Sequence, residues 1–228
     1  MIRLFVENDL VCGADIELSV FQAHYVRHVM RLKSGDEIAC FNGRQGQWSG
    51  NLSYTKKSAF LKIQKQTQKQ QNLPECILCP ALIKKEAMDF IWQKATELGV
   101  TKIYPIVAER SVVKSFNSNH ALAVVREACE QCERLDVPEI MEPDTLEATI
   151  LKLKGKVRLV WLFERGGAAD FHSTESAAFF VGPEGGWSEK EQKLLINKAD
   201  DAWHLGNTIL RAETACLAAL AVYQSKKK

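Results

Sequence analysis

The 228-residue chain lacks an apolar run of the roughly 20 residues that a membrane-spanning helix needs. The apolar stretch within residues 1–7 is too short, and too soon charged, to be a secretory signal peptide. We therefore expect a cytoplasmic protein with no membrane partner. Neither G-x-x-x-x-G-K-S/T nor G-x-G-x-x-G occurs, so the sequence also lacks the phosphate-binding loops typical of nucleotide-hydrolysing enzymes.

Net charge is small as well, at only +2, but it is unevenly distributed. Residues 1–73 contain ten Lys and Arg against six Asp and Glu, a surplus of four, so the remainder carries minus two. A basic N-terminal part is compatible with a phosphate-rich partner. A solvated surface explains a surplus of this size equally well.

Seven cysteines include two C-x-x-C pairs, Cys76 with Cys79 and Cys129 with Cys132, which together could supply a four-thiolate zinc site. Neither pair lies on the glycine-bearing turn that zinc knuckles use. Cys76 and Cys79 belong to an apolar, strand-like run, in which positions three apart point to opposite faces. We predict no metal, and interpret these cysteines as small core residues in a reducing compartment.

Residues 1–72 contain short β-prone segments separated by turn signals, which predict a small β-barrel. An Asn42-Gly43 pair indicates a hairpin within it. A helix is expected over residues 20–32, with Val26, Val29 and Met30 on its apolar side. The polar, aperiodic stretch 65–72 is predicted to be a linker. The expected strands are residues 4–6, 15–18, 37–41, 47–52 and 60–63.

Residues 73–228 alternate strand and helix patterns, which predicts an α/β domain with a mainly parallel sheet covered by helices on both faces. A hydrophobic content of 46% is enough for two modest cores of this kind. The expected strands are residues 75–82, 102–107, 137–141, 157–163, 178–181 and 202–205. The expected helices are residues 84–98, 119–135, 146–153, a segment opened by a Ser188-x-x-Glu191 capping box, and 212–224.

Glycine-rich turns follow two of these strands, at residues 182–186 and 206–208. Adjacent glycines let backbone groups approach a ligand without an intervening Cβ, and Pro183 fixes its own φ. Taken alone, such a turn between strand and helix is more often structural. Two of them at the ends of neighbouring strands nevertheless predict one wall of a ligand pocket.

The full pattern, FFVGPEGGWSEKE followed by LGNTILRAETACLAAL, resembles the C-terminal motifs of SPOUT methyltransferases. Within that superfamily it is similar to the ribosomal RNA small subunit methyltransferase E family. The segments at residues 24–32, 93–100 and 109–113 agree with that family in the same order. The chain departs from it at Asn207-Thr208, where a proline or arginine pair is more usual, and at Trp187, which replaces phenylalanine.

This resemblance implies that a PUA-like RNA-binding barrel (residues 1–72) precedes a SPOUT domain (residues 73–228) with a C-terminal trefoil knot. The implied activity is S-adenosylmethionine-dependent methylation of N3 of a uridine in 16S rRNA of the small ribosomal subunit, by a homodimer. Ala215, Ala218, Ala219 and Val222 are expected to form the dimer face. The implied cofactor-binding residues are Leu162, Phe163, Glu164, Gly182, Pro183, Glu184, Gly185, Gly186, Leu205, Gly206, Asn207, Ile209 and Leu210.

Methyl transfer to N3 requires orientation of the base and stabilisation of negative charge on the flanking carbonyl oxygens. Arg211 and Arg110 carry fixed charge suited to that task, and Glu184 could accept the proton if burial raised its pKa. His204 is expected to be packed within a strand. The residues expected to bind RNA are Arg27, Arg31, Lys56 and Lys57.

Two alternatives stay open at this stage. One is another SPOUT methyltransferase, acting on ribose hydroxyls or on transfer RNA, which the N-terminal barrel and the segment 109–111 disfavour. The other is a non-catalytic RNA-binding adaptor with a degenerate knot. Both glycine turns and Arg211 are intact, so the sequence shows no sign of such decay.

Overall fold

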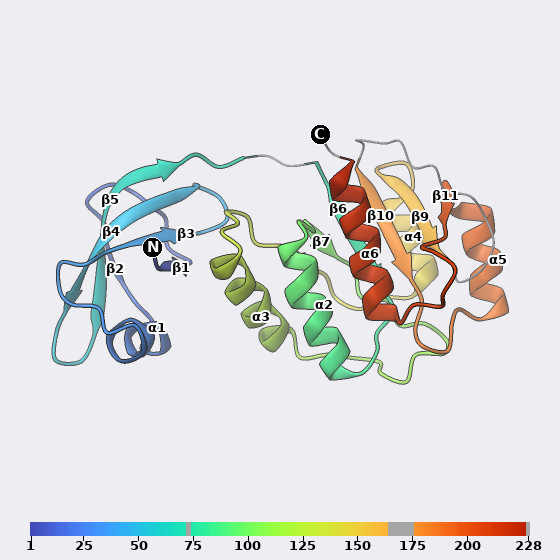
Figure 1. The fold of residues 1–228 in the computed structure, drawn as a ribbon, viewed down its shortest axis with the longest axis horizontal. Coiled ribbons are helices and arrows are strands. Elements are labelled where there is room, and N and C mark those ends of the chain that lie inside the picture. Colours follow the sequence, from blue (N-terminus) through green and yellow to red (C-terminus); the bar gives the residue numbers. More distant parts are fainter. Residues whose placement is uncertain (72–73, 164–175, 227–228) are drawn as a thin grey trace. The chain divides into compact units, whose positions relative to one another are not determined.

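The computed structural model describes residues 1–71, 74–163 and 176–226. By contact density the chain divides into two compact units, which are described separately (Figure 1). The first comprises Met1–Asn72 together with Cys129–Val137, and the second comprises Leu73–Ala128 and Pro138–Lys228. The boundary predicted between residues 72 and 73 lies outside the described residues.

A five-stranded mixed sheet forms the first unit, with β1 and β2 as its edge strands, so that the PUA-like fold is an open half-barrel. β1 pairs with β3 in parallel, and the other pairings are antiparallel. The hairpin predicted at Asn42-Gly43 is confirmed between β3 and β4, where Gly43 has φ +79°. In sheet order the strands are β1 (Arg3–Phe5), β3 (Glu37–Phe41), β4 (Gln47–Tyr54), β5 (Ala59–Gln68) and β2 (Asp15–Glu17).

β5 is longer than its sequence pattern indicates, so the linker predicted from residue 65 is wrong for residues 65–68. These residues pair with the start of β4, Lys65 opposite Ser49 and Gln68 opposite Gln47. Their side chains are all exposed, and a strand with no buried face has no hydrophobic alternation to reveal it. Backbone hydrogen bonds to β4, which pattern analysis does not detect, extend the strand.

The helix predicted over residues 20–32 is shorter and changes type within its length. A regular α1 (Val20–His24) continues into a π-helical turn, η1 (Tyr25–Val29), in which Met30 N donates to Tyr25 O at 2.9 Å. This i→i+5 bond accommodates an extra residue in the turn and rotates the positions that follow. Val26 is buried as expected, but Val29 is 57% exposed and Met30 38% exposed, so their assignment to the apolar side is wrong.

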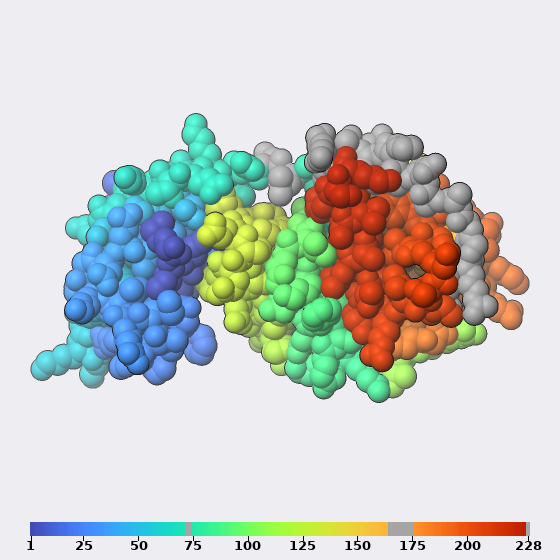
Figure 2. All heavy atoms as spheres, viewed as in Figure 1, coloured from blue at the N-terminus to red at the C-terminus, as the bar shows by residue number. Residues whose placement is uncertain are grey.

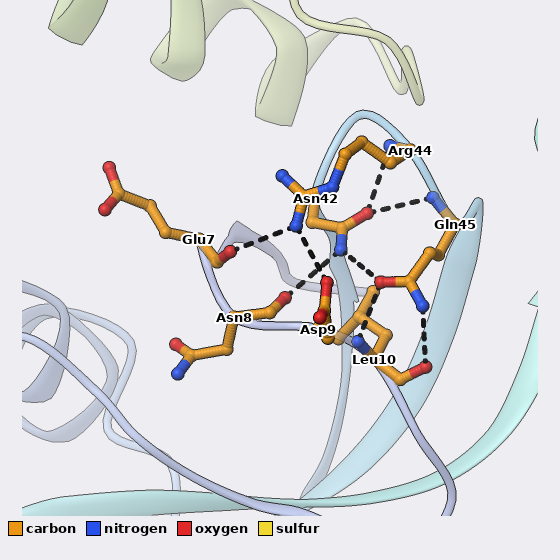
Figure 3. Close-up of polar contacts among 7 residues, drawn as sticks. All are labelled: Glu7, Asn8, Asp9, Leu10, Asn42, Arg44 and Gln45. Carbon is orange, nitrogen blue, oxygen red and sulfur yellow. Dashed lines mark hydrogen bonds and ion pairs between the residues drawn. The ribbon is translucent and has the colours of Figure 1, made fainter.

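A closed polar network connects the loop after β1 to the β3–β4 turn (Figure 3). The buried amide of Asn42 donates to Asn8 O at 3.1 Å and to Gln45 Oε1 at 2.6 Å, and it accepts from the backbone of Arg44 and Gln45. Gln45 Oε1 also accepts from Leu10 N at 2.9 Å. These bonds hold two loops of the half-barrel in one arrangement, as buried polar groups require.

Arg3 and Phe5 bind the segment Cys129–Val137, which belongs to the first unit; Phe5 N donates to Glu130 Oε1 at 2.8 Å. The Arg3 guanidinium donates to Cys129 O at 3.1 Å and to Arg134 O at 2.8 Å, and it lies 4.7 Å above the Phe41 ring. Desolvation by burial lowers the pKa of Arg3, which is only 7% exposed. Because Arg3 donates to these carbonyls, removal of residues 1–72 would leave them without this partner and residues 129–137 without their packing partner.

The second unit is built on a six-stranded sheet in which every pairing is parallel, which confirms the predicted sheet type. The central strand β10 is buried along its whole length, as expected for a parallel strand covered on both faces. In sheet order the strands are β11 (Asp201–Trp203), β9 (Arg158–Leu162), β10 (Ala177–Val181), β6 (Cys76–Pro80), β7 (Lys102–Ile103) and β8 (Glu139–Ile140).

Alternate residues of β10 face two helical layers. Phe180 packs with α4 and α5 residues, whereas Phe179 lies 5.2 Å from the Tyr223 ring of α6. Figure 1 shows α2 and α6 side by side on one face of the sheet and α4 behind it. The helices are α2 (Lys85–Glu97), α3 (Ser118–Gln131), α4 (Leu146–Leu153), α5 (Glu189–Lys198) and α6 (Ala212–Ser225).

The doubly covered parallel sheet preceded by a PUA-like half-barrel is therefore the predicted fold class. The trefoil knot expected from the family resemblance stays a prediction. Among the described residues, no helix is both long enough and apolar enough to cross a membrane.

Candidate active site

The end of β9 with Phe163 and the loops that follow β10 and β11 line a cavity of about 550 Å³ in the second unit. These strands are neighbours in a parallel sheet, so their carboxyl ends meet at one edge, where ligands of open α/β sheets usually bind. In Figure 2 the segments after β10 form the orange to red surface of this unit. The loop from residue 107 to 111 and the N-terminal turn of α6 complete the wall through Arg110, Arg211, Ala212 and Ala215.

The loop of residues 182–187 owes its shape to one turn and one close contact. Gly186 N donates to Pro183 O at 2.8 Å, and Gly186 has φ +67°, which favours glycine. Trp187 is 4% exposed and lies directly against Gly182. The predicted Ser188–Glu191 capping box is confirmed and starts α5 immediately after the loop. The loop is thereby held at both ends.

Most residues predicted to bind the cofactor lie around this single cavity. Asn207 is not part of its lining, although Thr208 next to it is, and Glu164 lies outside the described residues. Whether the lining residues contact a cofactor stays a prediction. Those that line the cavity are Leu162, Phe163, Gly182, Pro183, Glu184, Gly185, Gly186, Leu205, Gly206, Ile209 and Leu210.

All three residues predicted to be catalytic also lie at the cavity wall. Arg211 is the N-cap residue of α6, and its exposed guanidinium has no hydrogen-bond or ion-pair partner among the described residues. Arg110 donates from Nη1 to Gly185 O at 3.0 Å. A role of Glu184 as proton acceptor was predicted on the condition that the residue is buried. Glu184 is exposed, so that condition is not met.

Sequence patterns missed several residues of the wall, notably Trp161, His204 and Gln192. His204 was expected inside a strand, but β11 ends at Trp203, and the His204 ring lies at the cavity, 6.2 Å from the Phe163 ring. Trp161 belongs to β9 and stacks obliquely on Phe163, with ring centroids 5.2 Å apart. A tryptophan within an apolar strand gives no sequence signal of a binding role.

The lining suits a ligand that has both flat apolar parts and hydrogen-bond acceptors. The indole N–H groups of Trp161 and Trp187 are buried without a hydrogen-bond partner among the described residues. A buried donor left unpaired costs about 1–3 kcal/mol, so a bound acceptor would offset that cost. Phe163, Leu205 and Leu210 supply apolar surface beside these donors. An adenosyl group with an amino-acid tail has these properties, so the residues present fit S-adenosylmethionine.

The residues predicted to bind RNA belong to the first unit. Arg27 donates from Nη2 to Thr55 O at 3.0 Å, and its guanidinium lies 4.5 Å above the Tyr54 ring. Lys56 and Lys57 follow in the exposed turn between β4 and β5. Arg31 is exposed just beyond the π-helical turn, at φ +55°. The structure thus brings Arg27 close to the turn that carries the two lysines, while no contact links Arg31 to them.

The cysteine pairs show thiols in apolar surroundings. Cys76, Cys79 and Cys129 are buried; burial raises the pKa of Cys129 to about 12, and it also raises the pKa of Cys79 well above its ordinary value. Among the described residues, no group of three or more His, Cys, Asp and Glu side chains is arranged to hold a metal ion.

Comparison with known proteins identifies matches over nearly the whole chain. The family model of an RNA methyltransferase domain matches residues 69–224, and that of an RNA methyltransferase PUA domain matches residues 22–64. The ribosomal RNA small subunit methyltransferase E of Rickettsia conorii is 31% identical over 227 residues, covering 96% of this chain and 93% of that protein.

Two solved structures share the fold. The enzyme of the same name from Neisseria gonorrhoeae, solved with S-adenosyl methionine, has a TM-score of 0.89 at 29% identity, covering 99% of this chain and 97% of the other. A methyltransferase structure from Legionella pneumophila, also containing bound SAM, has a TM-score of 0.87 at 29% identity, covering 98% of this chain and 97% of the other.

Proposed function

Because the chain belongs to the ribosomal RNA small subunit methyltransferase E family, we propose that it transfers a methyl group from S-adenosylmethionine to N3 of a uridine in 16S rRNA. The observation that carries this proposal is the cavity at the carboxyl ends of β9, β10 and β11, which has Arg110 and Arg211 in its wall. An RNA-binding adaptor would also use arginines to bind phosphates, so it is the cofactor-sized cavity beside them that favours an enzyme.

The cofactor would be held by the loops of residues 182–186 and 205–210 with Leu162 and Phe163. When bound, S-adenosylmethionine supplies a methyl group on a sulfonium centre. The glycine loop lets backbone groups approach the adenosyl part closely, because no Cβ lies between them. The indole N–H groups of Trp161 and Trp187 are the candidate donors to a cofactor acceptor, since both are buried and unpaired among the described residues.

Arg211 and Arg110 would orient the base and stabilise it as N3 loses its proton. Negative charge then spreads over the two flanking carbonyl oxygens, and guanidinium groups are planar donors suited to such acceptors. Arg211 is available because its guanidinium has no partner among the described residues. Glu184 remains the candidate for the proton acceptor in sequence terms, although its exposed carboxylate lacks the burial that would tune it for that role.

RNA binding is assigned to the N-terminal part, residues 1–72, and catalysis to residues 73–228. Arg27 sits beside the exposed Lys56-Lys57 turn, so three cations gather on one edge of the half-barrel. Cations in such a cluster neutralise backbone phosphates without reading sequence. Arg31 extends the same basic surface if the RNA path follows the π-helical turn.

A homodimer is proposed on the family relationship, with one correction to its expected face. Ala219 is fully buried within the protomer, so it is not available for an interface. Val222 is 38% exposed, and Ala218 is half-buried on the same helix. Ala215 is half-buried as well, but it lines the cavity, so Ala218 and Val222 are the positions of the expected face that lie away from the cavity.

The decisive experiment is to map methylated nucleotides in 16S rRNA from cells with and without the gene, and to repeat the reaction with purified protein, labelled S-adenosylmethionine and small subunits. We expect one N3-methyluridine that disappears without the gene. A 2′-O-methyl ribose or a modified transfer RNA would support the alternative methyltransferases instead. Incorporation into neither RNA would leave only the adaptor hypothesis.

A further inference from the structure

Glu191 is a buried carboxylate that binds two backbone amides from distant parts of the second unit. Its Oε2 accepts from Ser188 N at 2.9 Å and completes the capping box of α5. Its Oε1 accepts from Glu109 N, also at 2.9 Å, although Glu109 lies 82 positions earlier. The residue is 6% exposed. One side chain therefore joins the start of α5 to the loop of residues 107–111.

The loop held in this way carries Arg110, whose guanidinium donates to Gly185 O at 3.0 Å. The aliphatic part of Arg110 also approaches the glycine loop, with its Cβ 3.6 Å from an ideal Cβ built on Gly185. On the other side of the turn, Lys114 Nζ donates to Ala108 O at 2.9 Å. The direction of the Arg110 side chain thus depends on where the Glu109 backbone is anchored.

Helix capping does not account for both bonds of Glu191. A capping box requires one acceptor oxygen, and glutamine serves at that position as well as glutamate does. The second oxygen is the one that reaches Glu109, and a carboxylate differs from an amide in that it offers two separate acceptor oxygens, one for each of these N–H groups. A charged acceptor also makes stronger hydrogen bonds than a neutral one.

We propose that Glu191 is a positioning residue for the methyl-transfer reaction: it fixes the Glu109–Arg110 turn against the loop of residues 182–187, so that the Arg110 guanidinium meets the substrate base. The role of Arg110 at the substrate base rests on the proposed function, whereas the bond between Glu191 and Glu109 N does not. Glu191 acts on the reaction only through Arg110 and touches neither cofactor nor RNA.

Two substitutions separate the bridging role from the capping role in the full-length protein. Glu191→Gln keeps one acceptor for Ser188 N and turns an amide N–H toward Glu109 N, so it breaks the bridge but not the cap. Ser188→Ala removes the hydroxyl that accepts from Glu191 N at 3.2 Å, so it weakens the cap but leaves the bridge. Ser188 does not line the cavity, which makes it a matched control.

We expect Glu191→Gln to lower kcat with small subunits about tenfold, with the KM for S-adenosylmethionine within about twofold, because a displaced charge costs rate more than cofactor binding. Ser188→Ala should leave kcat within about twofold and lower the melting temperature by about 2–4 °C. In an Arg110→Gln background, Glu191→Gln should have no further effect on kcat. Equal losses of kcat in the two single variants, or additive losses in the double variant, would overturn the inference.

A readout without catalysis keeps the inference distinct from the proposed function. Exchange of the Glu109 amide hydrogen, followed by NMR, should accelerate about tenfold or more in Glu191→Gln and stay slow in Ser188→Ala. If the wild-type protein methylates no ribosomal RNA, the proposed function fails while this result still decides the anchoring. Slow exchange of the Glu109 amide hydrogen in Glu191→Gln would show that Glu191 does not anchor this turn, whatever the activity of the variant.

Discussion

Trp187 packs so closely against Gly182 that an ideal Cβ on Gly182 would lie 3.1 Å from the indole Nε1. The neighbouring atoms Cδ1 and Cε2 would be 3.2 and 3.3 Å away. The Trp187 ring thus fills the space beside the first glycine of the loop. Gly182 is required here by packing, whereas Gly186 is favoured by its positive φ.

Gly182→Ala should therefore destabilise the protein, because the buried indole cannot move without disturbing its neighbours. Overpacking of this kind costs about 1–3 kcal/mol. Gly185→Ala is the matched control, since its Cβ would meet Arg110 at an ordinary 3.6 Å. Thermal melts of the two variants check the prediction. Equal melting temperatures would show that Trp187 adapts freely.

Gly185→Val should abolish detectable binding of S-adenosylmethionine while preserving the fold. Gly185 is exposed at the cavity, and a Cβ at this position meets Arg110 at 3.6 Å, so a branched side chain crowds the cavity wall beside Arg110 rather than the core. Surface substitutions without such a role usually change stability by less than about 0.5 kcal/mol. Calorimetric titration measures the affinity, and a melt confirms folding. Unchanged affinity would remove Gly185 from the cofactor wall.

Asp89 links α2 to the start of α3 and predicts a pH-dependent contribution to stability. It accepts from Lys85 Nζ at 2.5 Å and lies 2.9 Å from His120 Nε2. Partial burial raises the pKa of Asp89, but the bonds from Lys85 and His120 outweigh it, so the net pKa is lowered. A carboxyl group whose pKa is lowered by folding stabilises the protein at pH values above its unfolded-state pKa, near 3.9. This stabilisation is lost as the pH falls through the folded-state pKa.

Asp89→Asn should consequently be less stable than the wild type at pH 7, by up to about 1 kcal/mol for a partly exposed ion pair. The difference should hold down to about pH 5 and shrink below about pH 4. Urea unfolding across this pH range tests both parts. A difference that grows as pH falls below about 4, where the Asp89 carboxylate is lost, would have the wrong sign and reject the assignment.

Local patterns were sufficient to predict most of the second unit. The Leu146–Leu153 helix matches its expected bounds, because its periodicity and flanks agree. The Ser188–Glu191 capping box was also predictable, since both partners lie within one turn. The features that the sequence did not predict depend on contacts between residues far apart in the chain. The bond from Glu109 to Glu191 spans 82 positions, so the sequence pattern revealed only the capping half of Glu191.

The first unit was harder to predict for related reasons. A π-helical turn displaces Val29 and Met30 by one register, and no propensity scale marks such a turn in advance. Arg3 donates to the carbonyls of Cys129 and Arg134, and residues 129–137 belong to the first unit. The residues on both sides of this segment in the chain belong to the second unit. His204 was misplaced by a single residue at the end of β11, within the usual error of element boundaries.

If α6 mediates a homodimer, Val222→Asp should convert it to a monomer at micromolar concentration. In an isologous interface the same residue is present in both subunits, so two aspartates would be buried facing each other. The desolvation cost is therefore doubled. Leu151→Asp is the control, because Leu151 is a 71% exposed apolar residue on α4. Sedimentation velocity distinguishes the species. A wild-type protein that sediments as a monomer and keeps full activity would contradict the dimer.

RNA affinity should depend on salt through the cations of the half-barrel, and cofactor affinity should not. Each neutralised phosphate contributes a slope of about 0.9 for duplex or about 0.7 for single strands to the fall of log affinity with log salt. Deleting residues 1–72 is a poor test, because Arg3 binds the carbonyls of Cys129 and Arg134. Reversing charges in the intact chain avoids that disruption.

Lys56→Glu with Lys57→Glu is the cleaner variant, since both residues are exposed in one turn and the contacts of Arg27 to Tyr54 and Thr55 persist. It should reduce the salt slope by about one unit for each phosphate that the variant no longer neutralises, and raise the KM for small subunits with kcat retained. The control, Lys156→Glu with Lys193→Glu, makes the same change of net charge on exposed residues outside the cavity lining. Were both pairs to shift RNA affinity equally, net charge alone would govern binding, and the half-barrel would have no specific phosphate-binding role at this turn.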